Sequence, residues 1–158
     1  MHYTRDAWKV LNLFMIPSHF ISLTAIQERR PLRPTARRSG WVGCNILLDR
    51  LPTDGWIPII EDGSIRKDTD VRDDWRRFSF LKDSTVSSRG WTSDVLACVR
   101  RLGKNEFSLR DLYAFEEKLR ELHPKNKHIR PKIRQQLQIL RDKCFLRFIG
   151  RGLYRVLE

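Results

Sequence analysis

The residues of this chain that are best suited to bind a charged ligand lie near its C-terminal end. Between Lys125 and Arg155 the sequence contains ten Lys or Arg residues and a single acidic residue, Asp142. An excess of positive charge at this density matches the phosphate backbone of a nucleic acid. The alternative is a solvated basic face on an ordinary helix, so the elements that position these residues decide between the two interpretations.

Residues 128–142 have the spacing of an amphipathic helix. Ile133, Leu137 and Leu140 fall at i, i+4 and i+7, and therefore share one buried face. The polar residues of the opposite face and its flanks are Arg134, Gln135, Gln138, Arg141 and Asp142. A glutamine amide can pair with the N7 and N6–H edge of adenine, and an arginine can pair with guanine or a phosphate. The exposed face of this helix is therefore expected to read bases.

Residues 144–157 alternate in polarity and turn at Gly150-Arg151-Gly152, a pattern typical of a β-hairpin. A basic helix followed at once by a basic hairpin indicates a winged helix-turn-helix, in which the helix enters a DNA groove and the hairpin, or wing, holds the backbone. The residues expected to contact DNA in this region are Arg130, Lys132, Arg134, Gln135, Gln138, Arg141, Arg147, Arg151, Tyr154 and Arg155.

Two further helices are expected before this segment. The first is capped by Thr92 or Ser93 and ends at Gly103. The second follows Ser108, an N-cap with Asp111 three residues later in a capping-box arrangement. The expected buried residues are Val95, Leu96, Val99 and Leu102 in the first helix and Leu112, Phe115, Leu119 and Leu122 in the second. Three helices and a hairpin make a winged-helix domain of about 70 residues, a size that can fold alone.

A second arginine-rich segment, residues 29–41, has the composition of a loop because it contains two prolines and a glycine. It holds five arginines, among them Arg37 and Arg38, and ends at Trp41. Such a loop is suited to backbone contacts combined with stacking or wedging at a base. The alternative is that Trp41 begins the next strand and belongs to the core.

The N-terminal half reads as part of a sheet. Residues 8–16 are nearly all apolar, which predicts a strand buried on both faces. Because few residues precede it, we expect its partners to be missing and the domain to be incomplete. Strands are also predicted at 42–48 and 56–60, the latter at an edge because of Pro58. The remaining signals are a short helix at 20–27, a turn at 62–63 and a linker composition at 84–90.

Composition and charge restrict the function. Residues 1–85 carry 14 basic and 11 acidic residues, a net of +3, whereas residues 86–158 carry 17 and 8, a net of +9. No apolar run approaches the roughly 20 residues of a membrane span. Cys44, Cys98 and Cys144 form no C-x-x-C pair that would predict a zinc site, and free thiols suit a reducing cytoplasm.

The sequence contains few candidates for catalysis. Its four histidines are dispersed, with no obvious Ser or Cys partner. A metal-dependent nuclease needs spaced carboxylates and a lysine on strands, but the E-x-K present here, Glu116-Glu117-Lys118, falls in a predicted helix. The residues therefore favour a DNA-binding module attached to a piece of a sheet.

Three blocks, residues 35–46 (TARRSGWVGCNI), 87–92 (SSRGWT) and 132–143 (KIRQQLQILRDK), resemble the methyl-directed restriction endonucleases of the DpnI type, also called the Dam-replacing family. The final hairpin, Gly150-Arg151-Gly152 followed by Tyr154-Arg155, fits as well. The resemblance implies a nuclease domain of the PD-(D/E)xK kind followed by a winged helix, and cleavage of N6-adenine-methylated GATC with Mg²⁺. It also implies that Trp41, which follows the family's Arg-Arg-x-Gly, lies at the methylated base.

The resemblance also implies what this chain lacks. The family's catalytic Asp, its E-x-K and its four zinc-binding cysteines have no counterpart in this sequence. Cleavage is therefore implied for a longer parent, and this chain, which belongs to a Mg-dependent deoxyribonuclease family by resemblance, is expected to bind DNA without a cofactor and to be inactive alone.

We therefore expect an α+β chain. Residues 1–83 would form the incomplete C-terminal part of a nuclease-type α/β domain, the remnant of a PD-(D/E)xK sheet, with a linker at 84–90 and a winged helix-turn-helix domain at 91–158. The expected partner is double-stranded DNA with methylated GATC, bound by a monomer in the cytoplasm and without a membrane. The alternative is a winged-helix transcriptional regulator without nuclease function, but such a regulator normally forms a two-fold dimer and no dimerisation helix is evident.

Overall fold

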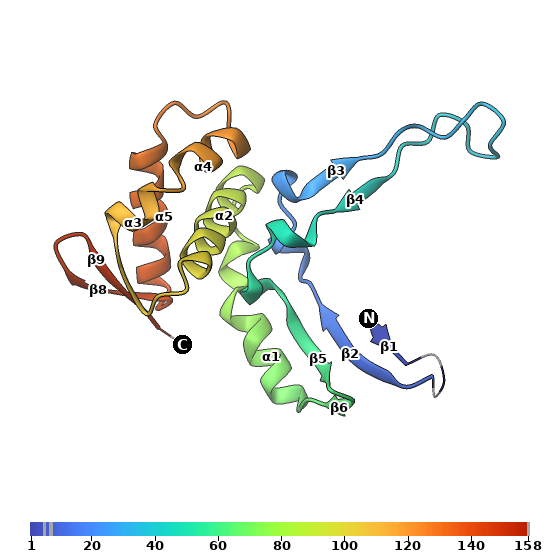
Figure 1. The fold of residues 1–158 in the computed structure, drawn as a ribbon, viewed down its shortest axis with the longest axis horizontal. Helices are drawn as coiled ribbons and strands as arrows, with labels where there is room; N and C mark the ends of the chain where they lie inside the picture. The colour runs from blue at the N-terminus through green and yellow to red at the C-terminus, as the bar shows by residue number, and fades with distance from the viewer. Residues whose placement is uncertain (5, 7, 158) are drawn as a thin grey trace. The chain divides into compact units, whose positions relative to one another are not determined.

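The computed structural model describes residues 1–158 except Arg5, Ala7 and Glu158. It divides into two compact units, residues 1–89 (unit 1) and residues 90–158 (unit 2). Each unit combines helices with antiparallel strands, so the chain is of the α+β class, as predicted (Figure 1).

Unit 1 is built on a four-stranded antiparallel sheet with the strand order β1-β2-β5-β6. The strands are β1 (His2–Tyr3), β2 (Val10–Met15), β5 (Ile57–Glu61) and β6 (Ser64–Ile65). Asp62 and Gly63, both with positive φ, form the predicted tight turn between β5 and β6. Helix α1 (Asp68–Arg77), which was not predicted from the sequence, packs against β5.

Strand β2 differs from the predicted strand that is buried on both faces. Its side chains are only partly buried, and Trp8, just before it, is 79% exposed. The prediction that β2 lacks an earlier partner is also wrong, because β1 pairs with it and places His2 opposite Asn12. Neighbouring strands cover only the edges of β2, and helix α1 packs against β5, so the faces of β2 stay partly open to solvent.

The predicted edge position of Pro58 is wrong as well, because β5 lies between β2 and β6. Strand β6 pairs with β5 at Ile60 and Glu61, so Pro58 stays clear of that ladder and the missing N–H is tolerated.

Where an α-helix was predicted at 20–27, the chain forms two 3-10 turns, η1 (Ser18–Phe20) and η2 (Leu23–Ala25), and then enters a strand. Further 3-10 turns of unit 1 are η3 (Leu48–Arg50), η4 (Thr53–Gly55) and η5 (Ser79–Leu81). The buried apolar residues of this unit are Phe20, Ala25, Leu51, Ile57, Phe78 and Leu81. Phe20 and Phe78 meet edge to face, with their ring centroids 4.9 Å apart.

A two-stranded arm projects from the body of unit 1 (Figure 1). It is formed by β3 (Ile26–Glu28) and β4 (Cys44–Ile46), which pair antiparallel with Gln27 opposite Asn45. The strand predicted at 42–48 is thus shorter than expected. Most side chains of the arm are exposed, so cross-strand hydrogen bonds rather than a core define its shape.

Unit 2 has the winged helix-turn-helix architecture that the sequence predicts. Its elements are α2 (Val86–Leu102, which begins in the last residues of unit 1), β7 (Glu106–Ser108), α3 (Leu109–Tyr113), α4 (Glu116–Leu122), α5 (Ile129–Asp142), β8 (Leu146–Gly150) and β9 (Leu153–Val156). The hairpin β8–β9 is the wing, and β7 extends it to a three-stranded sheet in the order β7-β9-β8. Fully buried side chains from several elements, including Val95, Leu112, Leu119, Ile133 and Leu137, form the core.

The start of α2 corrects the predicted linker at 84–90 and the predicted caps Thr92 and Ser93. The helix begins at Val86, and the Thr85 hydroxyl accepts a hydrogen bond from the Ser88 N–H (3.2 Å), which is the geometry of an N-cap. Thr92 and Ser93 lie inside the helix and are buried. The helix ends before Gly103, which has a φ of +61°, as predicted.

The second predicted helix is divided into α3 and α4. Its capping box is confirmed: the Ser108 hydroxyl accepts from the Asp111 N–H, and the Asp111 carboxylate accepts from the Ser108 N–H (2.8 Å). The helix breaks at Ala114 and Phe115, where the backbone leaves regular helical geometry before α4 starts. Leu112 and Leu119 of the predicted stripe are fully buried on either side of this break.

Candidate nucleic-acid interface

Helix α5 has a buried apolar face and an exposed polar face. Ile129, Ile133, Leu137 and Leu140 are buried, which confirms the predicted stripe. Arg134, Gln135, Gln138 and Arg141 are exposed, as predicted. At 100° per residue, Gln135 and Gln138 lie on either side of the direction opposite the centre of the buried face. Because the apolar residues of α5 face the core, its arginine and glutamine side chains face the solvent.

Three of the arginines predicted to contact DNA form ion pairs with carboxylates of the chain. Arg130 Nε lies 2.6 Å from Glu116 Oε2, and its guanidinium lies over the Tyr113 ring, 5.0 Å from the centroid. Arg155 Nη2 lies 2.7 Å from Glu106 Oε1 in a cross-strand pair. Arg141 pairs with Asp142 at 2.9 Å. These cations are less available to a phosphate than their number in the sequence suggests.

Other predicted residues have no such partner. The side chains of Arg134, Gln138, Arg147 and Arg151 make no hydrogen bond or ion pair with another described residue. Lys132 donates to the Gln135 side-chain oxygen at 2.7 Å, so Gln135 is partly engaged within the helix. Arg134 and Gln138 are therefore the side chains of α5 that are best prepared to take a new hydrogen-bond partner.

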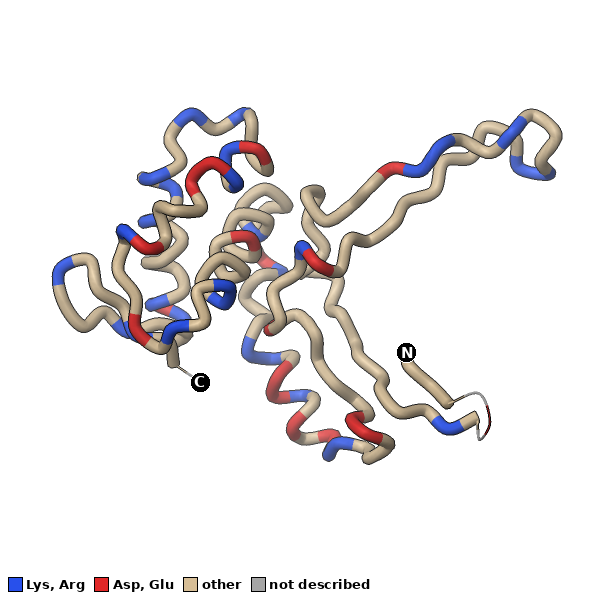
Figure 2. The backbone as a smooth tube through the Cα atoms, viewed as in Figure 1, with Lys and Arg blue, Asp and Glu red and all other residues tan. Residues whose placement is uncertain are grey.

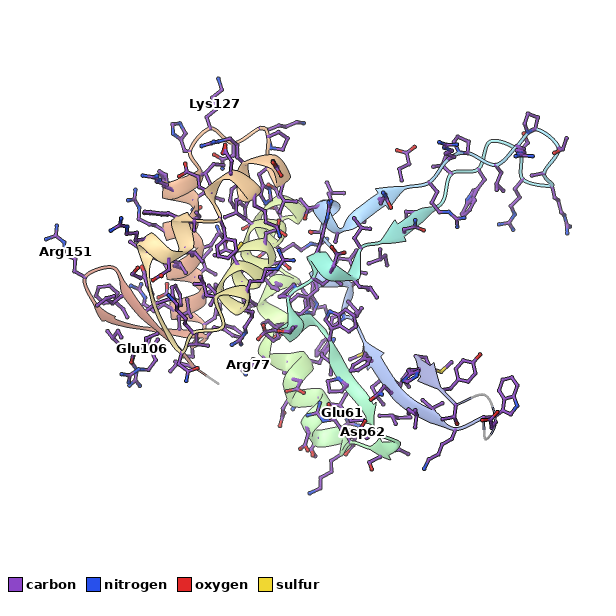
Figure 3. The ribbon with its side chains drawn as sticks, viewed as in Figure 1. Glu61, Asp62, Arg77, Glu106, Lys127 and Arg151 are labelled. Carbon is purple, nitrogen blue, oxygen red and sulfur yellow. The ribbon has the colours of Figure 1, made fainter. Side chains whose placement is uncertain are left out.

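The wing and the loop between α4 and α5 extend the basic surface (Figure 2). Arg151 lies at the tip of the wing and points away from the fold, and Lys127 does the same from the loop (Figure 3). The base of the wing is fixed, because the Leu109 N–H donates to the Gly152 carbonyl oxygen (2.9 Å). Arg151 is thus a flexible cation on a positioned hairpin.

The arm of unit 1 carries the other predicted contacts. Trp41 is 53% exposed, so the alternative that it belongs to the core is wrong, and Arg37 and Arg38 are exposed near the tip. The Trp41 carbonyl accepts from the Leu32 N–H (3.0 Å), which ties the tryptophan to the opposite side of the arm. The arm therefore offers an indole on a defined backbone, with arginines beside it.

The Trp41 ring lies against Gly43. A Cβ added at Gly43 would stand 2.9 Å from two atoms at the far end of the indole, Cη2 and Cζ3, and 3.7 Å from Cδ of Arg29. The absence of a side chain at Gly43 therefore leaves the space that the ring occupies. This residue was not predicted from the sequence, although the glycine two residues after an exposed tryptophan was a usable signal.

The comparisons with known proteins agree with both units. Residues 1–84 match the Dam-replacing family, and residues 87–156 match the Dam-replacing HTH domain. The chain belongs to the Dam-replacing family. A helix-turn-helix domain within this family supports DNA binding in a restriction-related function.

In this Dam-replacing protein, one residue predicted to contact DNA, Tyr154, is buried. It is 8% exposed and stacks on Phe107, with ring centroids 5.6 Å apart and an interplanar angle of 16°. Burial raises the pKa of the phenol, although the nearby charges of Arg141 and Arg134 act in the opposite direction. Tyr154 is therefore a core residue of the wing sheet, and the family's Tyr-Arg pair is exposed at Arg155 alone.

Several buried polar residues that brace α2 were not predicted. The Thr92 hydroxyl donates to Oε1 of Gln136 (2.7 Å), and both residues are buried. His123 Nε2 lies 2.8 Å from Asp94 Oδ2, and the His123 ring stacks on Trp91 at 3.8 Å. These contacts link α2 to α5 and to the end of α4. The bond to Thr92 satisfies the buried Gln136 Oε1, whereas Gln136 Nε2 has no hydrogen-bond partner among the described residues.

The described residues do not fit the magnesium site that the resemblance implies for the family. In the part of the chain that the structure describes, no group of three or more His, Cys, Asp or Glu side chains could hold a metal ion. Nor does any described helix combine the length and the apolar character needed to cross a bilayer.

Proposed function

We propose that this Dam-replacing protein binds duplex DNA containing N6-adenine-methylated GATC and serves as the recognition part of methyl-directed restriction. The observation that carries the proposal is the exposed face of α5, where Arg134 and Gln138 stand without a partner among the described residues, opposite a fully buried stripe. A helix that must bury one face can present the other to the major groove in a fixed orientation.

The chemistry of N6-methyladenine suits these side chains. The modified base keeps its N7 acceptor and one N6–H, so a glutamine amide can still pair with that edge. In this proposal Gln138 makes this contact, and Arg134 pairs with a neighbouring guanine. Gln135 is the weaker candidate because its side-chain oxygen already accepts from Lys132.

The added methyl group needs an apolar surface, and Trp41 supplies one. Its indole is half exposed on the arm, with Arg37 and Arg38 nearby for phosphates. Contact with the methyl group would remove apolar surface from water on both partners, which favours the methylated over the unmethylated site.

The test is a set of equilibrium binding measurements with the full chain and three duplexes of equal length. One carries methylated GATC, one unmethylated GATC, and one a methylated adenine in a scrambled context. We expect tighter binding to the first. Gln138→Ala should weaken binding to methylated GATC by about 1–3 kcal/mol while leaving the scrambled duplex nearly unchanged. Gln135→Ala is the matched control and should have the smaller effect.

Two outcomes would contradict the proposal. Equal affinity for the methylated and unmethylated GATC duplexes would remove the methyl-reading claim and favour a winged-helix transcriptional regulator. Equal losses on cognate and scrambled DNA in the Gln138→Ala variant would show that α5 does not read bases.

A further inference from the structure

One aromatic side chain of the wing is exposed although its neighbours on the sheet are buried. In the register of the sheet, Tyr154 of β9 lies opposite Phe107 of β7 on one side and Phe148 of β8 on the other. The three rings therefore form one row on one face of the sheet. Phe107 and Tyr154 are buried, whereas Phe148 is 49% exposed.

Phe148 lies on β8, one of the two edge strands of this sheet, and the other edge strand, β7, carries the buried Phe107. Phe148 meets Tyr154 edge to face, with centroids 5.8 Å apart and an interplanar angle of 72°, so one side of its ring is held by the sheet. The rest of the ring remains free to contact another molecule.

Exposed cations flank Phe148 along the hairpin, because Arg147 precedes it in β8 and its side chain is exposed. Arg151 lies in the turn beyond Phe148, at the tip of the wing (Figure 3). An apolar ring with cations on both sides along the surface matches a sugar–phosphate chain, whose charges alternate with apolar deoxyribose faces.

We propose that Phe148 is the apolar DNA contact of the wing and packs against the deoxyribose and base edges of the minor groove next to the major groove that α5 enters. The proposal rests on the proposed function, because it requires α5 to dock on a duplex. A hairpin beside the recognition helix reaches the flanking backbone, and phenylalanine is among the side chains that enter the minor groove as apolar wedges. Arg151 then holds a phosphate at the rim.

The contact has a distinctive salt dependence. An arginine that neutralises a phosphate releases counterions and makes binding depend on salt, whereas burial of a ring does not. Phe148→Ala should therefore weaken binding by about tenfold, since half of the ring remains to be buried, without changing the slope of log K against log salt. Arg151→Ala should instead flatten that slope by about one.

The experiment compares variants of the full chain on the methylated duplex. Leu153→Ala is the matched control, because Leu153 is 45% exposed on the same hairpin but lies opposite Gly150 and Ser108, outside the aromatic row. We expect Leu153→Ala to bind within about twofold of wild type, as an uninvolved surface residue would. Phe148→Tyr keeps the ring and should retain most of the affinity, which separates the loss of a contact from a loss of folding.

A second readout does not depend on the stability of an alanine variant. The photoreactive p-benzoylphenylalanine is placed at position 148 or at position 153 and irradiated with labelled duplex. We expect a DNA adduct from position 148 and little from position 153.

Three outcomes would count against these proposals. If Phe148→Ala binds with wild-type affinity while Arg151→Ala binds more weakly, this inference is overturned and the proposed function stays intact. If neither variant nor Gln138→Ala changes binding, the proposed function itself fails. A protein–protein adduct from position 148 would assign the ring to a second copy of the chain and also overturn the inference.

Discussion

The two units of this protein use their apolar residues in opposite ways. In unit 2, side chains from each long helix and from the wing sheet are fully buried around Leu137, and few large apolar residues of the described chain are exposed there. In unit 1, most large apolar residues outside the small core around Phe20 and Ile57 remain in contact with solvent, with Trp8 and Ile65 as extreme cases. The first pattern is that of an independent core, and the second that of an extended surface.

These two patterns predict which unit folds from local signals. Helix α5 is amphipathic by itself, and α3 begins at a complete capping box. The sheet of unit 1 instead joins strands that are far apart in the sequence, since Leu13 pairs with Ile60, and two of its strands have two residues each. Non-local pairing has a larger entropic cost, because a long loop must close before the strands can stabilise each other.

The largest expected effect is on the stability of the two units. Leu137→Ala should destabilise unit 2 by about 3 kcal/mol, because truncation of a fully buried leucine loses its transfer free energy and leaves a cavity. Ile57→Ala is the counterpart in unit 1, where Ile57 is also buried. Hydrogen exchange followed by mass spectrometry reports the two units separately, which a single unfolding midpoint of a two-part chain cannot do.

The independence of the two cores is confirmed if each substitution raises exchange in its own unit and leaves the other unchanged. We expect the peptides of α5 and β9 to stay protected in the Ile57→Ala variant. Joint loss of protection in both units after either substitution would contradict the view that unit 2 has an independent core.

The next effect concerns the arm of unit 1, which has no core to fix its side chains. Gly43→Ala should displace the Trp41 indole, because the new methyl group would stand 2.9 Å from the far end of the ring. The backbone tolerates alanine there, since the φ of Gly43 is outside the left-handed region. If the indole covers the adenine methyl group, the methylated-to-unmethylated affinity ratio should fall by up to about fourfold, the value of one buried methyl group.

A double-mutant cycle tests whether Gly43 acts through Trp41. Trp41→Ala should lower the ratio to a similar extent, and adding Gly43→Ala to that variant should change nothing further. Val42→Ala, at an exposed neighbouring position, is the control. Additive losses in the double variant would show that Gly43 acts on the arm backbone rather than on the indole.

Features with local determinants were predicted correctly from the sequence. The stripe of Ile133, Leu137 and Leu140 was confirmed, as were the cap Ser108 and the glycine that ends α2. The prediction was wrong at residues 84–90, where serines and a glycine were interpreted as a linker although Thr85 caps a helix. Helix α1 was missed because its only large apolar residues are Val71 and Trp75, although these fall at i and i+4. Its signal is electrostatic, with Asp68 in the first turn and Arg76 and Arg77 in the last.

The sequence predicted which residue types make up the candidate site, but not which of their side chains are already held in ion pairs. Periodicity placed Arg134 and Gln138 on the outer face correctly. It could not reveal that Arg130 and Arg155 hold Glu116 and Glu106, because these pairs join segments 14 and 49 residues apart. Nor could alternation along the two wing strands distinguish the buried Tyr154 of β9 from the exposed Phe148 of β8, since burial depends on how the assembled domain covers each strand.

A smaller effect separates available from engaged arginines within unit 2. Arg151→Ala should reduce the slope of log K against log salt by about one, because a wing-tip arginine without an acidic partner contacts a phosphate. Arg155→Ala should reduce it by less, since its loss also frees Glu106 near the DNA. Binding isotherms at several salt concentrations measure both slopes. Equal changes for the two variants would mean that Arg155 leaves Glu106 when DNA binds.

Mild acid should weaken unit 1 before unit 2. His19 is buried beside Phe20 and Trp75, and burial, aided by the charges of Lys82 and Arg89, lowers its pKa. A group with a lowered pKa contributes stability above its unfolded pKa of about 6.5, and this is lost as the pH falls toward the folded value. His19→Gln removes the titration. The protection of unit 1 against hydrogen exchange, corrected for the pH dependence of the chemical exchange rate, should therefore depend less on pH between neutral pH and about pH 5 in this variant than in wild type. An unchanged dependence would assign the sensitivity to other groups.

The smallest expected effect is the acid response of unit 2, which lies in a lower window. The pKa of Asp111 is well below its usual range because its carboxylate accepts hydrogen bonds from Lys104 and from the side chain and N–H of Ser108. The stabilisation is therefore complete above the unfolded pKa of about 3.9 and is lost progressively as the pH falls below it. Asp111→Asn should be less stable than wild type at pH 7, and the difference should shrink near pH 3, where the wild-type carboxylate begins to lose its advantage. Because Lys104 is exposed, molar salt should weaken its share while leaving the capping hydrogen bonds in place. A stability difference that is the same at pH 7 and pH 3 would show that the cap acts through geometry alone, and that the charge of Asp111 contributes nothing to unit 2.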